Sequence, residues 1–218
     1  MASYDPELGQ RVHEHLVARG VETPALRVDM DPLAKKIMIE QSFATIMRIL
    51  GLDLSDDSLA DTPKRVAKMY VDEIFSGLDY TNFPKCTTVD NKMHYDEMVV
   101  ERNITAISSC EHHFVTIDQK VDVAYIPKQK VIGLSKLNRL AKFFAQRPQI
   151  QERYAEQLFH ALSFILETEH IGVVVRGKHY CVAQRGVEDA SSFTVTSKLG
   201  GAFKSEIIVR KEFMDLIK

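Results

Sequence analysis

Two short clusters of metal-ligating residues stand far apart in this sequence. The first is Cys110-Glu111-His112-His113 and the second is His179-Tyr180-Cys181, and together they hold two of the three cysteines. Two thiolates and an imidazole nitrogen are ligands that zinc prefers, and three protein ligands leave a fourth position open for water. A site of this composition could therefore carry out a hydrolysis.

The spacing within each cluster sets conditions on the local structure. Successive side chains of a strand alternate between its faces, so His179 and Cys181 point the same way if residues 170–183 form one strand, and an unbroken strand adds Arg185 to that face. Cys110 and His113 are three residues apart, so joint metal binding requires a turn or bulge between them. If these two and Cys181 hold the metal, His112 and His179 remain beside it to move protons near neutral pH.

Other interpretations of the clusters stay open at this point. Cys110 and Cys181 could form a disulfide, or the four polar groups could share no site at all. The spacing is not that of a structural zinc finger, which normally carries two CxxC-type knuckles. Two compact clusters, each next to a strand, nevertheless favour zinc over these alternatives.

Two further stretches could bind a nucleotide. Gly133-Leu134-Ser135-Lys136-Leu137-Asn138-Arg139 puts Ser135, Lys136 and Arg139 in the first turns of an expected helix, where backbone amides and cations suit a polyphosphate. Arg185 strengthens this interpretation. Gln151 and Glu152 could offer a purine an amide and a carboxylate, although capping of a helix start by Glu152 is the simpler explanation.

Composition limits the protein class. The chain has 218 residues, 45% hydrophobic and 27% charged, and a formal net charge of −2. This composition indicates a globular protein and argues against nonspecific nucleic-acid binding, which needs a basic surface. We find no signal peptide and no apolar run of membrane-spanning length, so we expect a cytoplasmic protein without a membrane partner.

The first half of the chain predicts helices. Residues 6–19 form an amphipathic segment before Gly20, and residues 33–50 place an apolar stripe on one side before Gly51. Thr62 and Pro63 look like a helix N-cap and first residue. We expect residues 1–95 to form a helical N-terminal region attached to a second domain, residues 96–218.

The second half predicts an α+β domain. Strands are expected over residues 98–108 and 114–126, helices from 137 to near Pro148 and from 150 to 166, strands over 170–183 and 193–196, and a last helix over 206–217. This order indicates an antiparallel sheet covered by helices on one face.

Several motifs, in order and spacing, resemble those of the GTP cyclohydrolase I family. They cover about residues 35–205 and are Asp61-Thr62-Pro63-Lys64-Arg65, Cys110-Glu111-His112-His113, Gly133-Leu134-Ser135-Lys136, Arg147-Pro148-Gln149-Ile150-Gln151-Glu152-Arg153, His179-Tyr180-Cys181 and Arg185-Gly186. The resemblance implies the tunnelling fold, an antiparallel four-stranded sheet with two helices on one face, preceded by a helical region. It also implies a homo-oligomer, typically a decamer of two pentamers, with active sites between subunits.

The resemblance further implies a reaction and residue roles. The family opens the imidazole ring of GTP, releases C8 as formate and recloses the product to 7,8-dihydroneopterin triphosphate, the first step of pterin and tetrahydrofolate biosynthesis. By this resemblance, zinc is held by Cys110, His113 and Cys181. His179 protonates N7, His112 assists proton transfer, and Ser135 acts in the sugar rearrangement. Gln151 and Glu152 read the guanine edge, and the triphosphate is held by Lys136, Arg139, Arg185 and Arg65.

The sequence departs from the family pattern at two places. Gln119 stands where the family usually has glycine, which questions a tight turn with positive φ there, and Tyr154-Ala155 replaces an aliphatic and small polar pair. The rival hypotheses are a divergent paralogue that binds or hydrolyses a related purine nucleotide, a zinc deaminase, and a redox module. The deaminase signature of H-x-E with P-C-x-x-C is missing.

Overall fold

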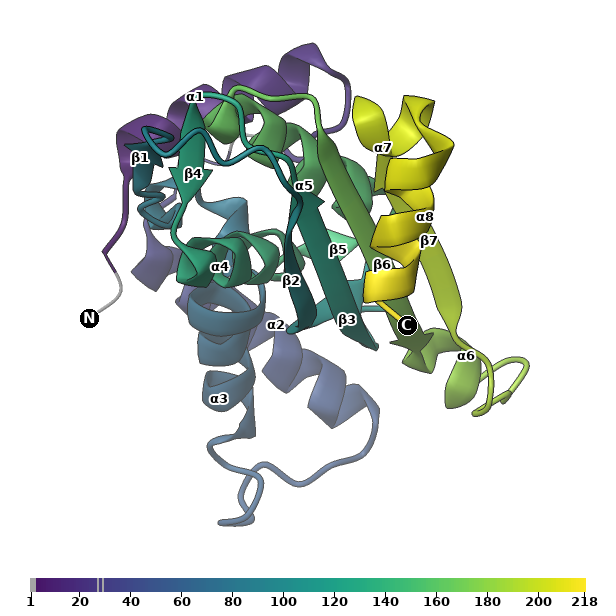
Figure 1. Ribbon diagram of the computed structural model, residues 1–218. Helices are drawn as coiled ribbons and strands as arrows, with labels where there is room; N and C mark the ends of the chain where they lie inside the picture. The colour runs from purple at the N-terminus through teal and green to yellow at the C-terminus, as the bar shows by residue number, and fades with distance from the viewer. Residues whose placement is uncertain (1–2, 27, 29) are drawn as a thin grey trace.

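A five-stranded sheet forms the centre of the protein in the computed structural model, which describes residues 3–26, 28 and 30–218 (Figure 1). The strand order is β5-β2-β3-β6-β7. The four long strands, β2 (Val99–Cys110), β3 (Thr116–Tyr125), β6 (Ile171–His179) and β7 (Thr194–Leu199), pair antiparallel, and β5 (Pro148–Gln149) adds two residues parallel to β2. The α+β class and the four-stranded antiparallel sheet predicted from the sequence are confirmed.

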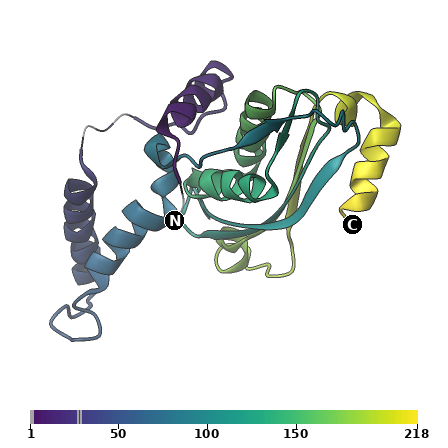
Figure 2. The same ribbon diagram turned by 60° about the vertical axis from the view of Figure 1, so that its left-hand side comes forward.

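Two helices cover one face of this sheet, as predicted. α4 (Leu134–Ala145) packs on β2 and α5 (Gln151–Leu166) on β6 and β7, and their apolar side chains share one buried core with the valines of β3 and β6 (Figure 2). The alternation of buried residues along β3 explains this contact, because every second side chain faces the helices. A small antiparallel pair, β1 (Thr88–Asp90) with β4 (Lys130–Ile132), lies apart from the main sheet.

The other face of the sheet is covered in part by the C-terminal segment. α7 (Ala202–Ser205) and α8 (Ile207–Leu216) place Phe203 and Phe213 against Ala124 and Val174 in a second buried cluster. A glycine at position 172 allows this approach, since a Cβ there would lie 2.9 Å from a ring carbon of Phe213. The expected last helix is thus present and has a packing role.

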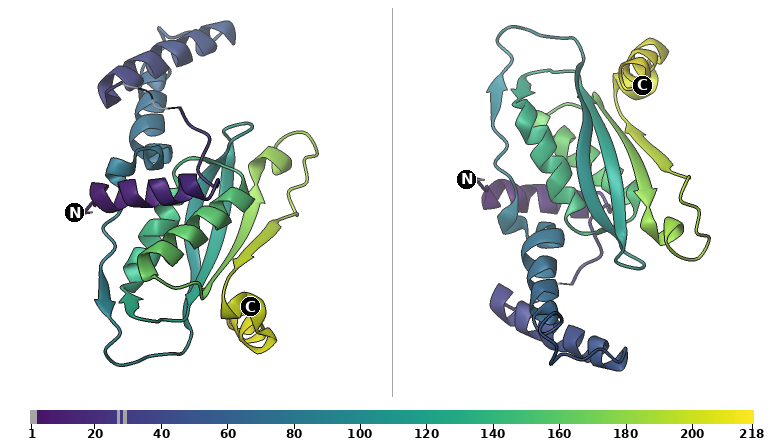
Figure 3. Two further views of the ribbon diagram at one scale, coloured as in Figure 1. Left: turned by 90° about the horizontal axis from the view of Figure 1, so that it is seen from above. Right: turned by 90° about the horizontal axis from the view of Figure 1, so that it is seen from below.

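The N-terminal helices make two different kinds of contact. α1 (Pro6–Ala18) lies beside α5 (Figure 3), and its Val12 and Leu16 side chains belong to the main buried core. In contrast, α2 (Pro32–Ile49) and α3 (Thr62–Lys68) pair with each other and project away from the sheet (Figure 2). The proposed domain division at residues 95 and 96 stays a prediction, because α1 shares its core with the second half.

The helix starting near Thr62 differs in detail from the prediction. Its N-cap is Asp61 rather than Thr62, and beyond Lys68 the chain continues as a π-helix, η1 (Met69–Ile74). Short 3₁₀ turns follow at η2 (Ser76–Leu78) and η3 (Tyr80–Asn82). A π-helix widens the backbone spiral and often marks a functional region.

The apolar stripe predicted along the second helix is largely open to solvent. Met47 is buried, whereas Ile37, Ile46 and Leu50 are 46%, 48% and 71% exposed. No helix among the described residues is long and apolar enough to cross a membrane.

Candidate functional site

The loop that follows β2 brings two of the expected metal ligands together. The N–H of Phe114 donates to the carbonyl of Cys110 at 2.8 Å, and the N–H of Cys110 donates to the carbonyl of Val115, also at 2.8 Å. Phe114 adopts the left-handed conformation with φ 53°, which is uncommon for a bulky residue. This tight closure turns His113 back over Cys110, so the turn that joint metal binding requires is present.

The third expected ligand reaches the same place by a different route from the one predicted. β6 ends at His179, and Cys181 lies in the one-turn helix α6 (Tyr180–Ala183). The prediction of a continuous strand over residues 170–183 is therefore wrong, and strand alternation does not explain why His179 and Cys181 converge. The bend after His179 directs Cys181 toward the loop instead, and it also carries Arg185 back to that loop.

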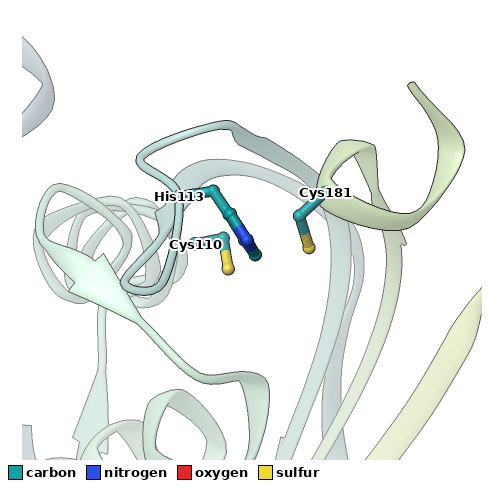
Figure 4. Close-up of side chains that lie close together, drawn as sticks. All are labelled: Cys110, His113 and Cys181. Carbon is teal, nitrogen blue, oxygen red and sulfur yellow. The ribbon is translucent and has the colours of Figure 1, made fainter. Parts of the chain in front are cut away.

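Cys110, His113 and Cys181 form a group that could hold a metal ion (Figure 4). One ligand atom from each residue lies within 4.8 Å of the other two. Ligands held about 2.0–2.3 Å from a tetrahedral zinc ion are separated by roughly 3.5 Å, so small side-chain rotations bring these atoms into range. The donor set of two sulfurs and one imidazole nitrogen fits zinc.

Both sulfur atoms of this group are free thiols in the structure. Burial and the neighbouring Cys110 raise the pKa of the Cys181 thiol. Burial is the larger cause of this shift, and the repulsion expected between two adjacent thiolates adds to it. The third cysteine, Cys86, lies elsewhere, and burial raises its pKa to about 12.

His179 lies next to this group and is held in one orientation. Its Nε2 is 2.8 Å from Gln151 Oε1, while Gln151 Nε2 donates to the carbonyls of Val175 and Thr194, each at 3.1 Å. Carbonyl oxygens only accept, so the atom of Gln151 that faces His179 must be its oxygen. Neutral His179 therefore carries its hydrogen on Nε2 and has its lone pair on Nδ1. Burial lowers the pKa of His179, and the nearby Glu152 carboxylate partly opposes this shift.

The remaining loop residues surround the same group. His112 Nδ1 is 3.7 Å from Cys110 Sγ, and Arg185 Nη1 is 2.8 Å from His113 Nε2. Glu111, whose direction the sequence leaves open, forms an ion pair with Arg153 at 2.5 Å. The structure thus gathers two further histidines and one arginine around the three expected ligands.

Other expected substrate-binding residues lie on separate elements. Ser135, Lys136 and Arg139 are on the first turns of α4, and Arg65 is on α3, where it is 74% exposed and 3.7 Å from Asp61. No hydrogen bond or ion pair among the described residues connects these four to the Cys-His-Cys group. Gln151 is buried, and its amide contacts strands and His179 in this conformation.

The two departures from the family pattern lie inside the fold. Gln119 is within β3, paired with Ala106 and Gly177, which agrees with the strand expected over residues 114–126, and no tight turn occurs at this position. The hairpin turn of this strand pair comes earlier, at residues 111–115. Tyr154 and Ala155 are both buried in the core, and the Tyr154 hydroxyl donates to the carbonyl of Ala141 at 2.9 Å.

One residue near the site escaped the sequence analysis. The ring of Phe114 is 5.1 Å from that of Phe75 and 6.4 Å from that of Tyr70, measured between centroids. These contacts attach the loop after β2 to η1 and the turn after it. The spacing of apolar residues could not reveal these aromatic contacts, because Phe114 belongs to a loop and its partners are about 40 residues away in the sequence.

Comparisons with known proteins identify relatives of this chain. The family model for GTP cyclohydrolase I matches residues 39–218. The chain is 56% identical to GTP cyclohydrolase 1 of Yersinia enterocolitica, covering 100% of this chain and 99% of that protein. It is 54% identical to GTP cyclohydrolase 1 of Haemophilus ducreyi, covering 95% of each. A crystal structure of archaeosine synthase QueF-Like in the apo form has a TM-score of 0.39 at 16% identity, over 48% of this chain and 95% of that one. By its family match and its full-length relatives, this chain belongs to the GTP cyclohydrolase I family.

Proposed function

We propose that this protein opens the imidazole ring of GTP by hydrolysis, releases C8 as formate and recloses the product to 7,8-dihydroneopterin triphosphate. The observation that carries this proposal is the Cys110, His113 and Cys181 group with His179 beside it, in a chain of this family. When bound there, zinc would supply Lewis-acid activation of a water molecule at neutral pH. The side chains around the group supply proton transfer and orientation.

His179 is the proposed proton donor to N7 of the purine. Because Gln151 Oε1 holds the Nε2–H group, we infer that the proton moves at Nδ1. His112, next to Cys110 Sγ, is the proposed second proton carrier. Ser135, exposed at the start of α4, is the proposed residue for the later sugar rearrangement.

The proposed substrate contacts are of two kinds, hydrogen bonds to the guanine and positive charges for the triphosphate. The Glu152 carboxylate can accept two N–H donors from the guanine edge, and Gln151 is the proposed second contact to guanine, made from its position beside His179. Lys136, Arg139, Arg185 and Arg65 provide positive charge for the triphosphate. The first two lie near the N-terminus of α4, whose unpaired amides also attract anions.

An oligomer would explain why these contacts are dispersed over one chain. A groove of about 2260 Å³ runs between α2, η1 and α4, and it is lined by apolar residues of α2 together with Phe114 and Arg139. A second copy of the chain that covers this groove would bury the exposed stripe of α2 and bring its own residues near the loop. We infer a homo-oligomer, with the decamer of two pentamers as the expected form. The free cysteines suit a reducing compartment, which supports a cytoplasmic location.

The test is incubation of purified protein with GTP, with formate measured directly and the pterin measured by fluorescence after oxidation. We expect one formate per pterin formed, loss of both after treatment with a strong chelator, and recovery on addition of Zn²⁺. Full activity in zinc-free protein would contradict the mechanism. A zinc-loaded protein that is silent with GTP but active on another purine nucleotide would instead identify a divergent paralogue.

The loop anchor gives a separate prediction. We expect Phe114→Ala to weaken zinc binding about tenfold, because the loop loses its contacts with Phe75 and Tyr70, a loss comparable to that of other residues that support metal ligands. Competition with a chromogenic chelator measures the affinity. Phe114→Tyr keeps the ring and serves as the control. Equal zinc affinity in the alanine and tyrosine variants would show that the aromatic contacts do not position the loop.

A further inference from the structure

Gln119 is an anomaly in the interior of the sheet. Its side chain is fully buried, and neither its oxygen nor its nitrogen has a hydrogen-bond partner within the described part of the chain. Buried polar groups are nearly always paired, because an unpaired one loses its hydration without compensation. The buried, unpaired amide of Gln119 therefore indicates a function for this side chain.

The location of Gln119 connects it to the proposed proton donor. Gln119 is directly opposite Gly177 in the register of β3 and β6, and His179 follows two residues later on the same face. A Cβ atom built on Gly177 would lie 2.2 Å from Gln151 Oε1 and 3.4 Å from Gln119 Cγ. The side chains of Gln119 and Gln151 therefore meet over the bare backbone of Gly177.

Not every hydrogen-bonding group of the two glutamine side chains over Gly177 is paired among the described residues. Gln151 Oε1 has two lone pairs, and His179 Nε2 uses one of them at 2.8 Å. Gln151 Nε2 is fully occupied by the carbonyls of Val175 and Thr194. The second lone pair of Oε1 is therefore open, and the amide nitrogen of Gln119 is an unused donor in the same small space.

Ser108 is the candidate partner for Gln119 on the other side. Its hydroxyl is also buried without a partner among the described residues, and it lies on β2 two residues after Ala106, which pairs with Gln119. Ser108 and Gln119 are thus diagonal neighbours on one face, within reach of each other for a side chain as long as glutamine. A hydroxyl donated to Gln119 Oε1 would leave Gln119 Nε2 to face Gln151.

We propose that Gln119 is a positioning residue for the reaction, which donates its side-chain N–H to Gln151 Oε1 and thereby keeps that oxygen on His179. The inference rests on the proposed function, and it extends the chain of contacts from Ser108 through Gln119 and Gln151 to His179. Catalytic hydrogen bonds are often long or poorly aligned before substrate binds and tighten when it does. Glycine at 177 is required because a side chain there would displace the Gln151 carboxamide.

The decisive variant is Gln119→Met, which keeps length and volume but removes the amide. We expect kcat to fall about tenfold with KM for GTP unchanged, while Tm stays equal or rises because an unpaired buried amide is gone. A role in stability alone would lower Tm together with activity. Gly177→Ala is a second variant, expected to lower kcat in the same way by pushing Gln151 Oε1 away from His179.

Gln157→Met is the matched control. Gln157 is equally buried, but its nitrogen donates to the Val21 carbonyl at 3.0 Å and its oxygen accepts from Gln149 Nε2 at 2.7 Å. We expect the opposite result, a lower Tm with kcat of the folded protein unchanged.

A readout that needs no substrate separates this proposal from the proposed function. Nitrogen-15 NMR of labelled histidine in the zinc-loaded protein should show His179 as the single Nε2–H tautomer, and Gln119→Met should give a mixture of tautomers. Unchanged kcat in Gln119→Met, or an unchanged single tautomer, would overturn the role of Gln119. If wild-type protein released no formate, the proposed function would fail while the tautomer measurement still decided this inference.

Discussion

The Cys181→Ser variant is expected to lose both its bound metal and its activity. Cys181 is one of three residues whose ligand atoms lie within 4.8 Å of one another, and its removal leaves only Cys110 and His113. A serine hydroxyl remains protonated near neutral pH and is a poor zinc ligand, whereas a thiolate binds zinc strongly. We expect the affinity to fall by more than the roughly 100-fold that loss of a supporting residue costs.

Metal analysis of the purified variant together with the formate assay measures both effects. Cys86→Ser is the matched control, since Cys86 is a free cysteine whose thiol contacts the carbonyl of Pro84 at 3.3 Å, apart from the metal group. It should keep its zinc and its activity. A Cys181→Ser protein with near-stoichiometric zinc would remove Cys181 from the ligand set.

The second large effect is expected for His179, whose replacement should abolish the reaction without removing the metal. His179→Ala is expected to keep zinc but lose ring opening, because the imidazole lies outside the group of ligand atoms and its Nε2 contacts Gln151. Loss of a positioned proton carrier typically costs roughly 10²–10⁴-fold in rate. Zinc content and kcat measured on the same preparation test the separation.

An exposed histidine outside the site provides the control. His94 has φ 53°, so His94→Asn keeps a residue type that tolerates this conformation and should leave zinc and kcat unchanged. Equal loss of zinc in His179→Ala and Cys181→Ser would refute the division between ligands and proton carriers. Full ring opening by His179→Ala would transfer the role of proton donor to another group, with His112 the nearest alternative.

The sequence predicted the main elements because their patterns are local. Alternation along β3 and the helical spacing of α4 and α5 follow directly from which side chains face one core. The end of β6 at His179 was not predictable in this way. The residues after it form a helical turn that carries Cys181 to the loop after β2, and that approach depends on contacts between distant segments.

For the candidate site, the residue types were a better guide than the expected strand geometry. Cysteine and histidine in two compact clusters pointed to a metal, whereas alternation along a strand gave the wrong route for Cys181. Gln119 shows the same limit, because a strand over residues 114–126 was predicted, whereas the pairing of Gln119 with Gly177 was not. Strand register depends on where the preceding hairpin turns, and a single sequence contains no direct record of that.

The ligand group has a consequence for the lifetime of the protein. Cys110 ends β2 and Cys181 follows β6, and these two strands are separated in the sheet by β3. A metal ion held by both would act as a cross-link across a non-adjacent strand pair, closing a long loop of chain and restraining the segment after α6. Metal starvation would release that segment to proteases, so cellular zinc supply would control the abundance of the enzyme as well as its turnover.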